Sequence, residues 1–292
     1  MSAMRLRSPR PPRNDEERIL PLINIVFLLL IFFMVAGRLA ASDPFPIVPP
    51  HSSSEGMVDT RDLAVFVAAD GRTLRVSATL EPVYELKGYS RIGFRMIQRV
   101  VVVRTDEELP RSSVTHLGTN DVLQVDLATL ARGMDRLRAE SGGEQQLSLI
   151  VPLSYVSLAS QRGRTELVKL LKEATAMLRC GVICEINDVE GVPAGALLAA
   201  VSLIKPFTLL TVGRLLAPTK TNLEGLRGAG LNAVSFDSPA GLSDPEFTAW
   251  ARATLTVARG AVRSVLVYGV VTPRRAAELA LLGASHASLS LR

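Results

Sequence analysis

The chain has 292 residues, of which 48% are hydrophobic and only 5% aromatic, and it carries a formal net charge of +5. This length allows a membrane anchor together with one large domain or two small ones. The positive charge does not indicate nucleic-acid binding, because aromatic residues are few and no basic motif recurs along the chain.

Residues 1–18 form a short, basic, proline-rich tail, which we expect to be disordered. Residues 19–37, ILPLINIVFLLLIFFMVAG, contain no charged side chain. About 19 residues at ~1.5 Å each span the ~30 Å hydrocarbon core of a bilayer, so we predict one transmembrane helix. The basic tail favours a cytoplasmic N-terminus. A cleaved signal peptide is the alternative, with Leu39-Ala40-Ala41 as its cleavage site.

Pro21 and Asn24 are the residues that interrupt this apolar segment. The sequence PLINIVFLLLIFFMV around them resembles the single membrane helix of the ExbD/TolR family. Those proteins act with a multi-helix ExbB/TolQ partner to couple proton-motive force to work across the envelope. The resemblance implies a single-pass protein of the bacterial inner (plasma) membrane. It also implies a chain that contacts the lipid bilayer, self-associates through its helix and binds an ExbB/TolQ-like partner.

The family's proton-carrying Asp falls on Asn24 in this chain. An ionisable group in a membrane helix can load and release a proton, whereas an amide cannot titrate. Asn24 can still form a hydrogen bond across a helix interface, which contributes ~0.6–2 kcal/mol in lipid. Two interpretations stay open. Asn24 holds helices together, or the chain is the non-protonated member of a heteromer whose partner supplies the Asp.

Residues 38–61 are rich in Pro, Ser and Ala, which predicts an extended linker. Residues 62–76 alternate apolar and polar side chains on both sides of Asp70-Gly71, a pattern typical of a β-hairpin. The ExbD/TolR family has a similar hairpin after its linker. The pattern fades after Val76, so we interpret residues 62–76 as an ExbD-like remnant and expect that resemblance to end there.

From residue 78 to residue 292, short apolar runs alternate with helix-like segments. The runs predicted as strands are residues 80–86, 92–103, 147–153, 181–186, 207–212, 233–236, 264–270 and 287–291. The predicted helices are residues 122–139, 164–179, 193–204, 220–229, 244–259 and 273–282. Near-continuous apolar strands separated by helices predict an α/β fold with a parallel sheet. Eight strands in this length favour a (β/α) barrel, and an open doubly wound sheet is the alternative.

The strand ends of this region, where a barrel carries its chemistry, resemble a degenerate EAL domain, the TIM barrel that hydrolyses cyclic di-GMP. Residues 93–99, GFRMIQR, fall on the family's G-x-E-A-L-x-R signature, with Arg95 in place of the Glu. Pro152 replaces a metal-binding Asn, and the family's Asp-Asp pair has no counterpart near Gly213-Arg214. Glu185 and Asp237 remain as residual carboxylates.

This resemblance implies a catalytic site that has lost its chemistry. Hydrolysis in the family needs divalent metals held by several carboxylates and an amide, and Arg95 places a cation where a ligand is required. We therefore expect no enzymatic activity, no metal and no other cofactor, and we do not expect binding of cyclic di-GMP. We expect Glu185 to accept hydrogen bonds from backbone N–H groups at its strand end.

The two resemblances imply different compartments. An ExbD/TolR-like helix places residues 78–292 in the periplasm, whereas an EAL-like domain and the unpaired Cys180 and Cys184 are typical of the cytoplasm. A genuine fusion, an inverted helix and an artificial join of two reading frames near Val76 stay open. We expect a membrane-anchored, non-enzymatic accessory subunit of proton-motive-force-driven biopolymer transport. The alternative is a membrane-tethered, catalytically dead EAL-like module for signalling or scaffolding.

Overall fold

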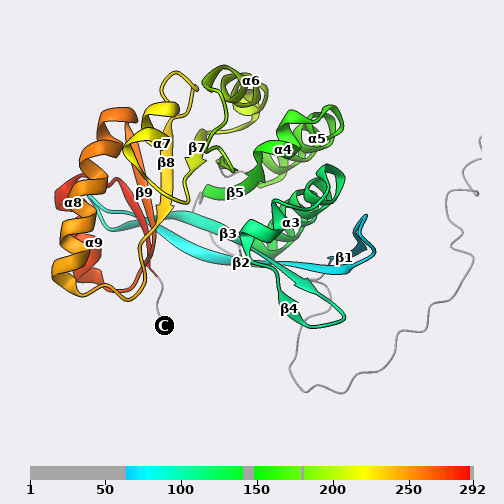
Figure 1. Ribbon diagram of the computed structural model, residues 1–292, viewed down its shortest axis with the longest axis horizontal. Coiled ribbons are helices and arrows are strands. Elements are labelled where there is room, and N and C mark those ends of the chain that lie inside the picture. The colour runs from blue at the N-terminus through cyan, green and yellow to red at the C-terminus, as the bar shows by residue number, and fades with distance from the viewer. Residues whose placement is uncertain (1–63, 141–147, 179–180, 290–292) are drawn as a thin grey trace, which may run out of the picture. The chain divides into compact units, whose positions relative to one another are not determined.

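The computed structural model describes residues 64–140, 148–178 and 181–289 (Figure 1). These residues belong to one compact unit, Val58–Arg292. The expected tail, transmembrane helix and linker, and with them Pro21 and Asn24, lie outside the described residues. Within the described ranges, no helix is both long enough and apolar enough to cross a bilayer.

Eight strands form a closed barrel in the order β2–β10–β9–β8–β7–β6–β5–β3, and β3 pairs back onto β2. Their bounds are β2 (Thr73–Glu85), β3 (Ser90–Val102), β5 (Ser148–Ser154), β6 (Val182–Asn187), β7 (Leu210–Arg214), β8 (Ala233–Asp237), β9 (Ser264–Val270) and β10 (His286–Leu289). Strand β2 is antiparallel to both β3 and β10, and the other neighbours in the barrel are parallel. The predicted barrel is confirmed, and the open sheet is wrong because β2 closes the ring.

Helices follow the parallel strands and cover the outside of the barrel (Figure 1). Their bounds are α3 (Thr119–Glu140), α4 (Tyr155–Ala159), α5 (Gln161–Leu178), α6 (Ala194–Ile204), the 3-10 turn η2 (Lys205–Phe207), α7 (Lys220–Gly225), α8 (Asp244–Ala261) and α9 (Pro273–Leu282). Local signals fix the best-defined ends. Ser243 and Glu246 form a capping box at the start of α8, and Gly283 ends α9 with a φ of 94°.

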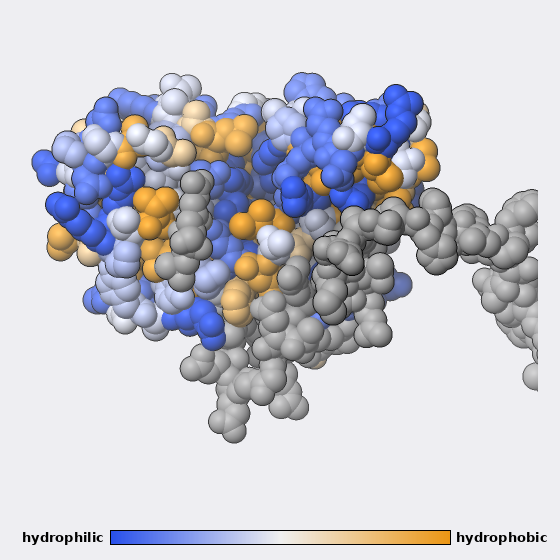
Figure 2. All heavy atoms as spheres, turned by 90° about the horizontal axis from the view of Figure 1, so that it is seen from below, coloured by the Kyte–Doolittle hydropathy of each residue, from blue (hydrophilic) through white to orange (hydrophobic). Residues whose placement is uncertain are grey.

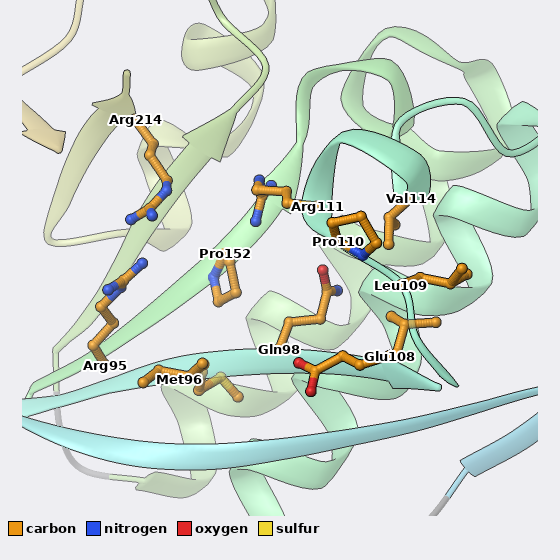
Figure 3. Close-up of a pocket in the computed structure, with 12 residues that line it drawn as sticks. Arg95, Met96, Gln98, Glu108, Leu109, Pro110, Arg111, Val114, Pro152 and Arg214 are labelled. Atoms are coloured by element: carbon orange, nitrogen blue, oxygen red, sulfur yellow. The ribbon is translucent and has the colours of Figure 1, made fainter. Parts of the chain in front are cut away.

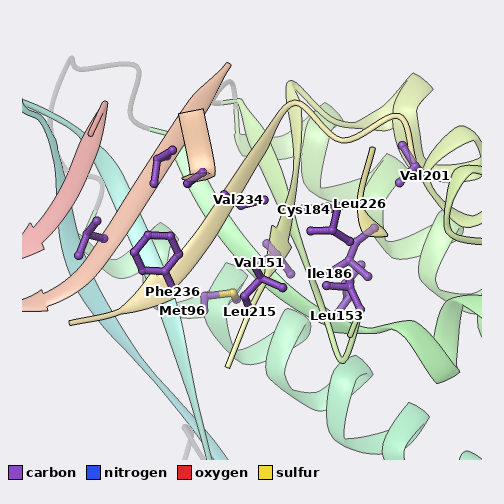
Figure 4. Close-up of a cluster of buried hydrophobic side chains, with 14 of the residues drawn as sticks. Met96, Val151, Leu153, Cys184, Ile186, Val201, Leu215, Leu226, Val234 and Phe236 are labelled. Atoms are coloured by element: carbon purple, nitrogen blue, oxygen red, sulfur yellow. The ribbon is translucent and has the colours of Figure 1, made fainter. Parts of the chain in front are cut away.

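The barrel strands read as continuous apolar runs because both of their faces are buried. Inward-facing side chains such as Ile150, Ile183 and Val212 fill the barrel. Outward-facing side chains such as Val151 and Phe236 pack against the surrounding helices, as Figure 4 shows for one part of that layer. On the outer surface drawn in Figure 2, the described hydrophobic side chains form small groups among hydrophilic ones.

Strands β2 and β3 are longer than the barrel needs, and their extended ends carry a small lobe. Strand β1 (Ala64–Val67) pairs with the first part of β2, and β4 (Glu107–Glu108) pairs with the end of β3. Helix α2 (Arg111–Val114) then leads into α3. The predicted turn at Asp70-Gly71 joins β1 to β2, and Gly71 adopts a φ of 83°, which favours glycine.

The predicted boundary between a hairpin ending at Val76 and a barrel starting at Ala78 falls inside a single strand. Strand β2 runs without interruption from Thr73 to Glu85 and pairs with β3 along its whole length. The first part of β2 packs in a second, smaller core with β3, α2 and α3. This core comprises Ala68, Leu74, Val76, Val100, Val102, Val114, Leu117, Val122 and Val125. The hairpin is therefore built into the same unit as the barrel.

Candidate functional site

A cluster of charged side chains lies at the C-terminal ends of the parallel strands. Because parallel strands end at the same side of a barrel, residues far apart in the sequence meet there. The cluster consists of Glu81 on β2, Arg95 on β3, Glu185 on β6, Arg214 on β7, Asp237 on β8 and Tyr268 on β9. Glu185, Arg95 and Arg214 are buried, whereas the side chain of Asp237 is 57% exposed.

Glu185 is the carboxylate at the centre of this cluster. The hydroxyl of Ser235 donates a hydrogen bond of 2.6 Å to its Oε1, and Arg95 Nε lies 3.5 Å from its Oε2. Burial raises the pKa of Glu185, but the positive charges of Arg95 and Arg214 outweigh burial and hold that pKa below its usual value. The expectation that backbone N–H groups satisfy Glu185 is wrong, because its partners in the structure are side chains.

Asp237, the second residual carboxylate, shares both arginines with Glu185. Arg214 Nη2 donates a hydrogen bond of 2.5 Å to Asp237 Oδ2, and Arg95 Nη1 lies 3.9 Å from Asp237 Oδ1. The barrel thus brings the two carboxylates predicted from the sequence to the same pair of guanidinium groups. Each arginine lies between a buried carboxylate and an exposed one.

Arg95 also stacks on an aromatic ring. Its Cζ lies 3.7 Å from the centroid of the Tyr268 ring, and its Nη1 lies 3.6 Å from Glu81 Oε2. Burial lowers the pKa of Arg95, but the negative charge of Glu185, followed by those of Asp237 and Glu81, raises it above its ordinary value. Arg95 is therefore a permanent cation that the surrounding carboxylates neutralise.

The EAL resemblance implies a divalent metal at this end of the barrel, and the residues present do not fit one. Arg95 stands where that family has a metal-ligating Glu, and its guanidinium contacts Glu185, the carboxylate that remains. Pro152 stands where the family has an Asn, and its side chain has no donor atom. Within the described part of the chain, no three His, Cys, Asp or Glu side chains are grouped to hold a metal.

A cavity of about 200 Å³ separates the charge cluster from the lobe (Figure 3). Arg95 and Arg214 line one side, Arg111 and Gln98 reach in between, and apolar residues form the opposite side. The complete lining is Arg95, Met96, Ile97, Gln98, Val100, Glu108, Leu109, Pro110, Arg111, Val114, Pro152 and Arg214. The cavity thus combines a cationic end with an apolar wall.

Arg111, Arg214 and Tyr268 belong to the site but were not predicted from the sequence. Arg214 and Tyr268 lie 29 and 83 positions beyond Glu185, so only closure of the barrel brings them to it. Their position at predicted strand ends was the available signal, but no motif set them apart. Arg111 follows Pro110 in a short segment without strong periodicity, so no sequence pattern selects it.

Asp126 is a further buried carboxylate, on α3 outside the charge cluster. Its Oδ2 accepts a hydrogen bond of 2.9 Å from the backbone N–H of Ser154, and its Oδ1 accepts one of 3.2 Å from the Ser154 hydroxyl. Burial raises its pKa to about 6. Asp126 therefore ties α3 to the end of β5.

Two comparisons with known proteins match different parts of the chain. Residues 11–129 match the family model of the biopolymer transport protein ExbD/TolR. This confirms the resemblance and extends it beyond Val76, into α3. No curated protein matches the chain.

Solved structures of EAL domains share the fold of the barrel. A structure described as "PaMucR Phosphodiesterase, c-di-GMP complex" is 14% identical with a TM-score of 0.55, and the match covers 73% of this chain and 93% of that one. The EAL domain protein of Listeria monocytogenes EGD-e is 16% identical, with a TM-score of 0.52 and coverages of 73% and 85%. The FimX EAL domain from Pseudomonas aeruginosa bound to c-di-GMP is 14% identical, with a TM-score of 0.53 and coverages of 73% and 88%.

These identities establish a shared fold and leave the chemistry of this chain open. Two of the neighbours are c-di-GMP complexes, so the comparisons give no support to the expectation that this chain does not bind that ligand. The chain therefore joins a segment that matches the ExbD/TolR family model to an α/β barrel with the fold of EAL domains.

Proposed function

We propose that this protein is a membrane-anchored, non-enzymatic accessory subunit of an ExbD/TolR-like biopolymer transport system. The observation that carries the proposal is the family match over residues 11–129. It includes the apolar segment 19–37, the linker and the lobe formed by β1, β2, β3 and α2. A match that continues from the anchor into the folded unit supports a genuine fusion over an artificial join near Val76.

In this proposal the barrel has no catalytic activity and acts as a scaffold. Buried guanidinium groups occupy the end of the barrel where hydrolysis would need bound metals, and Glu185 is already neutralised by Arg95 and Arg214. A carboxylate held in this way is not available to ligate a second cation. The buried cluster therefore supports a structural role for Glu185 and Asp237.

The proposed location is the bacterial inner membrane, with one span at residues 19–37 and the N-terminus in the cytoplasm. The barrel then lies in the periplasm. The segment 19–37 contacts lipid, self-associates and binds a multi-helix ExbB/TolQ-like partner. Asn24 faces the partner helices, and its amide forms a hydrogen bond at that interface.

Topology tests this proposal directly. We fuse a reporter active only in the periplasm, and separately one fluorescent only in the cytoplasm, after Arg292 of the full chain. The proposal predicts activity of the periplasmic reporter alone. A cytoplasmic C-terminus contradicts it and favours the membrane-tethered EAL-like module, while absence of a full-length product points to an artificial join.

Co-purification tests the partner. The full chain, extracted in detergent, is expected to retain a multi-helix membrane protein, and Asn24→Leu is expected to lose it because the buried amide hydrogen bond is removed. Ile25→Leu, which preserves the apolar character of the neighbouring position, serves as the control. A partner retained equally by all three proteins, and also by a fragment of residues 58–292, contradicts assembly through the helix.

The EAL fold of the barrel favours one alternative, a tethered signalling module that binds c-di-GMP without hydrolysing it. Calorimetric titration of the full chain with c-di-GMP distinguishes the two functions. Saturable binding favours the alternative, and the absence of heat favours the transport subunit. Arg95→Glu, which restores the acidic residue of the EAL signature, provides a second comparison for metal-dependent binding.

A further inference from the structure

Arg111 is a mostly buried guanidinium group without a hydrogen bond among the described residues. Its side chain is 26% exposed, and its ion-pair partner is Asp188, whose Oδ2 lies 3.9 Å from Nη2. A guanidinium group has five N–H donors in a planar fork. Burial lowers the pKa of Arg111, the positive charge of Arg214 acts in the same direction, and Asp188 offsets them in part. Arg111 thus has N–H groups that donate no hydrogen bond to another described residue.

Arg95 and Arg214 line the same cavity and carry positive charge there. Both residues are 8% exposed. Arg95 Nε, Arg214 Nε and Arg214 Nη1 are buried and make no hydrogen bond, because the nearby carboxylate oxygen of Glu185 lies 3.5–3.9 Å from Arg95 Nε and Arg214 Nη1. These donors face Glu185 inside the barrel, so Arg95 and Arg214 contribute their positive charge to the cavity.

The charges around the cavity favour an anion. Three arginines line it, and the acidic residue in its lining, Glu108, is paired with Arg99 at 2.7 Å. Glu185 and Asp237 contact Arg95 and Arg214 but are not part of the lining. An entering anion therefore meets guanidinium groups first.

The apolar wall of the cavity determines which uncharged part of a ligand fits. Leu109, Pro110 and Val114 stand opposite Arg95 and Arg214 in Figure 3, with Arg111 next to Pro110, and Met96 forms part of the floor. The cavity has a volume of about 200 Å³. An apolar group of the size of one amino-acid side chain suits the space.

We propose that this cavity binds a small carboxylate that carries an apolar group, with Arg111 gripping the carboxylate and the Leu109–Val114 wall holding the apolar part. A carboxylate matches the fork of a guanidinium in a bidentate pair. The same chemistry is offered by a free N-acylated amino acid and by the C-terminal residue of a polypeptide. This site does not depend on the proposed transport function.

Calorimetric titration of the full chain in detergent micelles with N-acetyl-L-leucine tests the proposal. We expect saturable binding, and no binding of N-acetyl-L-leucinamide, which has the same apolar group without the negative charge. Arg111→Gln should weaken binding tenfold or more, because it removes a charge-assisted pair. Arg104→Gln removes an exposed positive charge from the turn after β3 and should leave binding unchanged.

Two further arms complete the test. A tetrapeptide ending in leucine with a free carboxylate identifies a polypeptide C-terminus as the source if it binds, and a free small acid if it does not. Arg111→Lys keeps the charge but loses the fork, so intermediate binding with an unchanged circular dichroism spectrum separates recognition from folding. No binding of N-acetyl-L-leucine, equal binding of its amide, or equal affinity of Arg111→Gln overturns the proposal.

Discussion

Glu185 supplies the negative charge that allows two arginines to be buried at the mouth of the barrel. In Glu185→Gln, Arg95 and Arg214 keep their positive charges but lose the carboxylate between them. Leaving buried charges uncompensated costs about 3–5 kcal/mol. We expect that loss in the free energy of unfolding, measured by urea denaturation with the fluorescence of Trp250, the single tryptophan of the chain.

Asp237→Asn is the matched control, because Asp237 contacts the same two arginines but its side chain is 57% exposed. Solvent screens that pair, so its removal should cost less than about 1 kcal/mol. Equal losses in the two variants would contradict a central role for the buried carboxylate.

Asp126 should make stability depend on pH in the mildly acidic range. Its pKa is raised to about 6 in the folded protein, from 3.8. The folded state therefore binds the proton more tightly than the unfolded state. The stabilisation of the folded state by this bound proton is fully present below pH 3.8 and is lost as the pH rises through 6. Over this range the contribution amounts to about 3 kcal/mol.

Urea denaturation of the wild-type protein and Asp126→Asn at intervals from pH 4 to pH 7 isolates this contribution. The free energy of unfolding of Asp126→Asn, relative to the wild type, should rise by about 3 kcal/mol across the range, because its amide does not titrate. Asp106→Asn, an exposed carboxylate paired with Arg75, should follow the wild-type curve. Parallel curves for the wild type and Asp126→Asn would refute the assignment.

Glycine is required at position 93 because strands β3 and β5 lie close together there. Gly93 on β3 pairs with Ser148 on β5, and a Cβ atom at position 93 would lie 1.8 Å from the carbonyl oxygen of Ser148. Both backbones must move to admit it. We expect Gly93→Ala to lower the free energy of unfolding by about 3 kcal/mol or more.

Gly195→Ala provides the comparison within one experiment. Gly195 lies in the first turn of α6, and a Cβ there meets nothing within 4 Å. Alanine is the better helix former, so this change should stabilise the protein by up to about 1 kcal/mol. Thermal unfolding of both variants measures the contrast, and similar shifts in the midpoint would show that the β3–β5 approach is not tight.

Elements defined by local signals could be predicted, and the strand that crosses two cores could not. The predicted ranges 264–270 and 273–282 coincide with β9 and α9. Helix α9 begins at Pro273, directly after its N-cap Thr272, and Gly283 ends it. Strand β2, by contrast, passes from the core of the lobe to that of the barrel. Alternation of apolar and polar residues indicates that one face of a strand is buried. It does not indicate which hydrophobic core that face contacts.

The contacts between side chains at the site could be predicted only in part, because they depend on closure of the whole barrel. Glu185 and Asp237 were recognised through a motif that each retains. Arg214 and Tyr268 reach Glu185 only because the barrel closes. Where the end of a strand carries no recognised motif, the sequence does not show which residues its side chains will contact across the barrel. Closure is therefore the property on which the site depends.

Strand β10, the last in the chain, joins β9 to β2 in the ring, so the C-terminal end of the chain should control folding of the entire unit. Strand β10 pairs with β9 on one side and with β2 on the other, and its Ala287 and Ser288 are fully buried. A fragment of residues 58–284 lacks β10 and leaves β2 and β9 with unpaired edges. Such edges promote aggregation.

A fragment of residues 58–289 keeps β10 and serves as the control. We expect it to elute as a monomer in size-exclusion chromatography and to give a near-ultraviolet circular dichroism spectrum, which reports fixed packing around Tyr268 and Trp250. The 58–284 fragment should aggregate or lose that spectrum, because without β10 the arginines at the mouth of the barrel have no closed wall to hold them. A monomeric 58–284 fragment with an unchanged spectrum would mean that the barrel core is stable with its ring open, and that the charge cluster does not depend on closure.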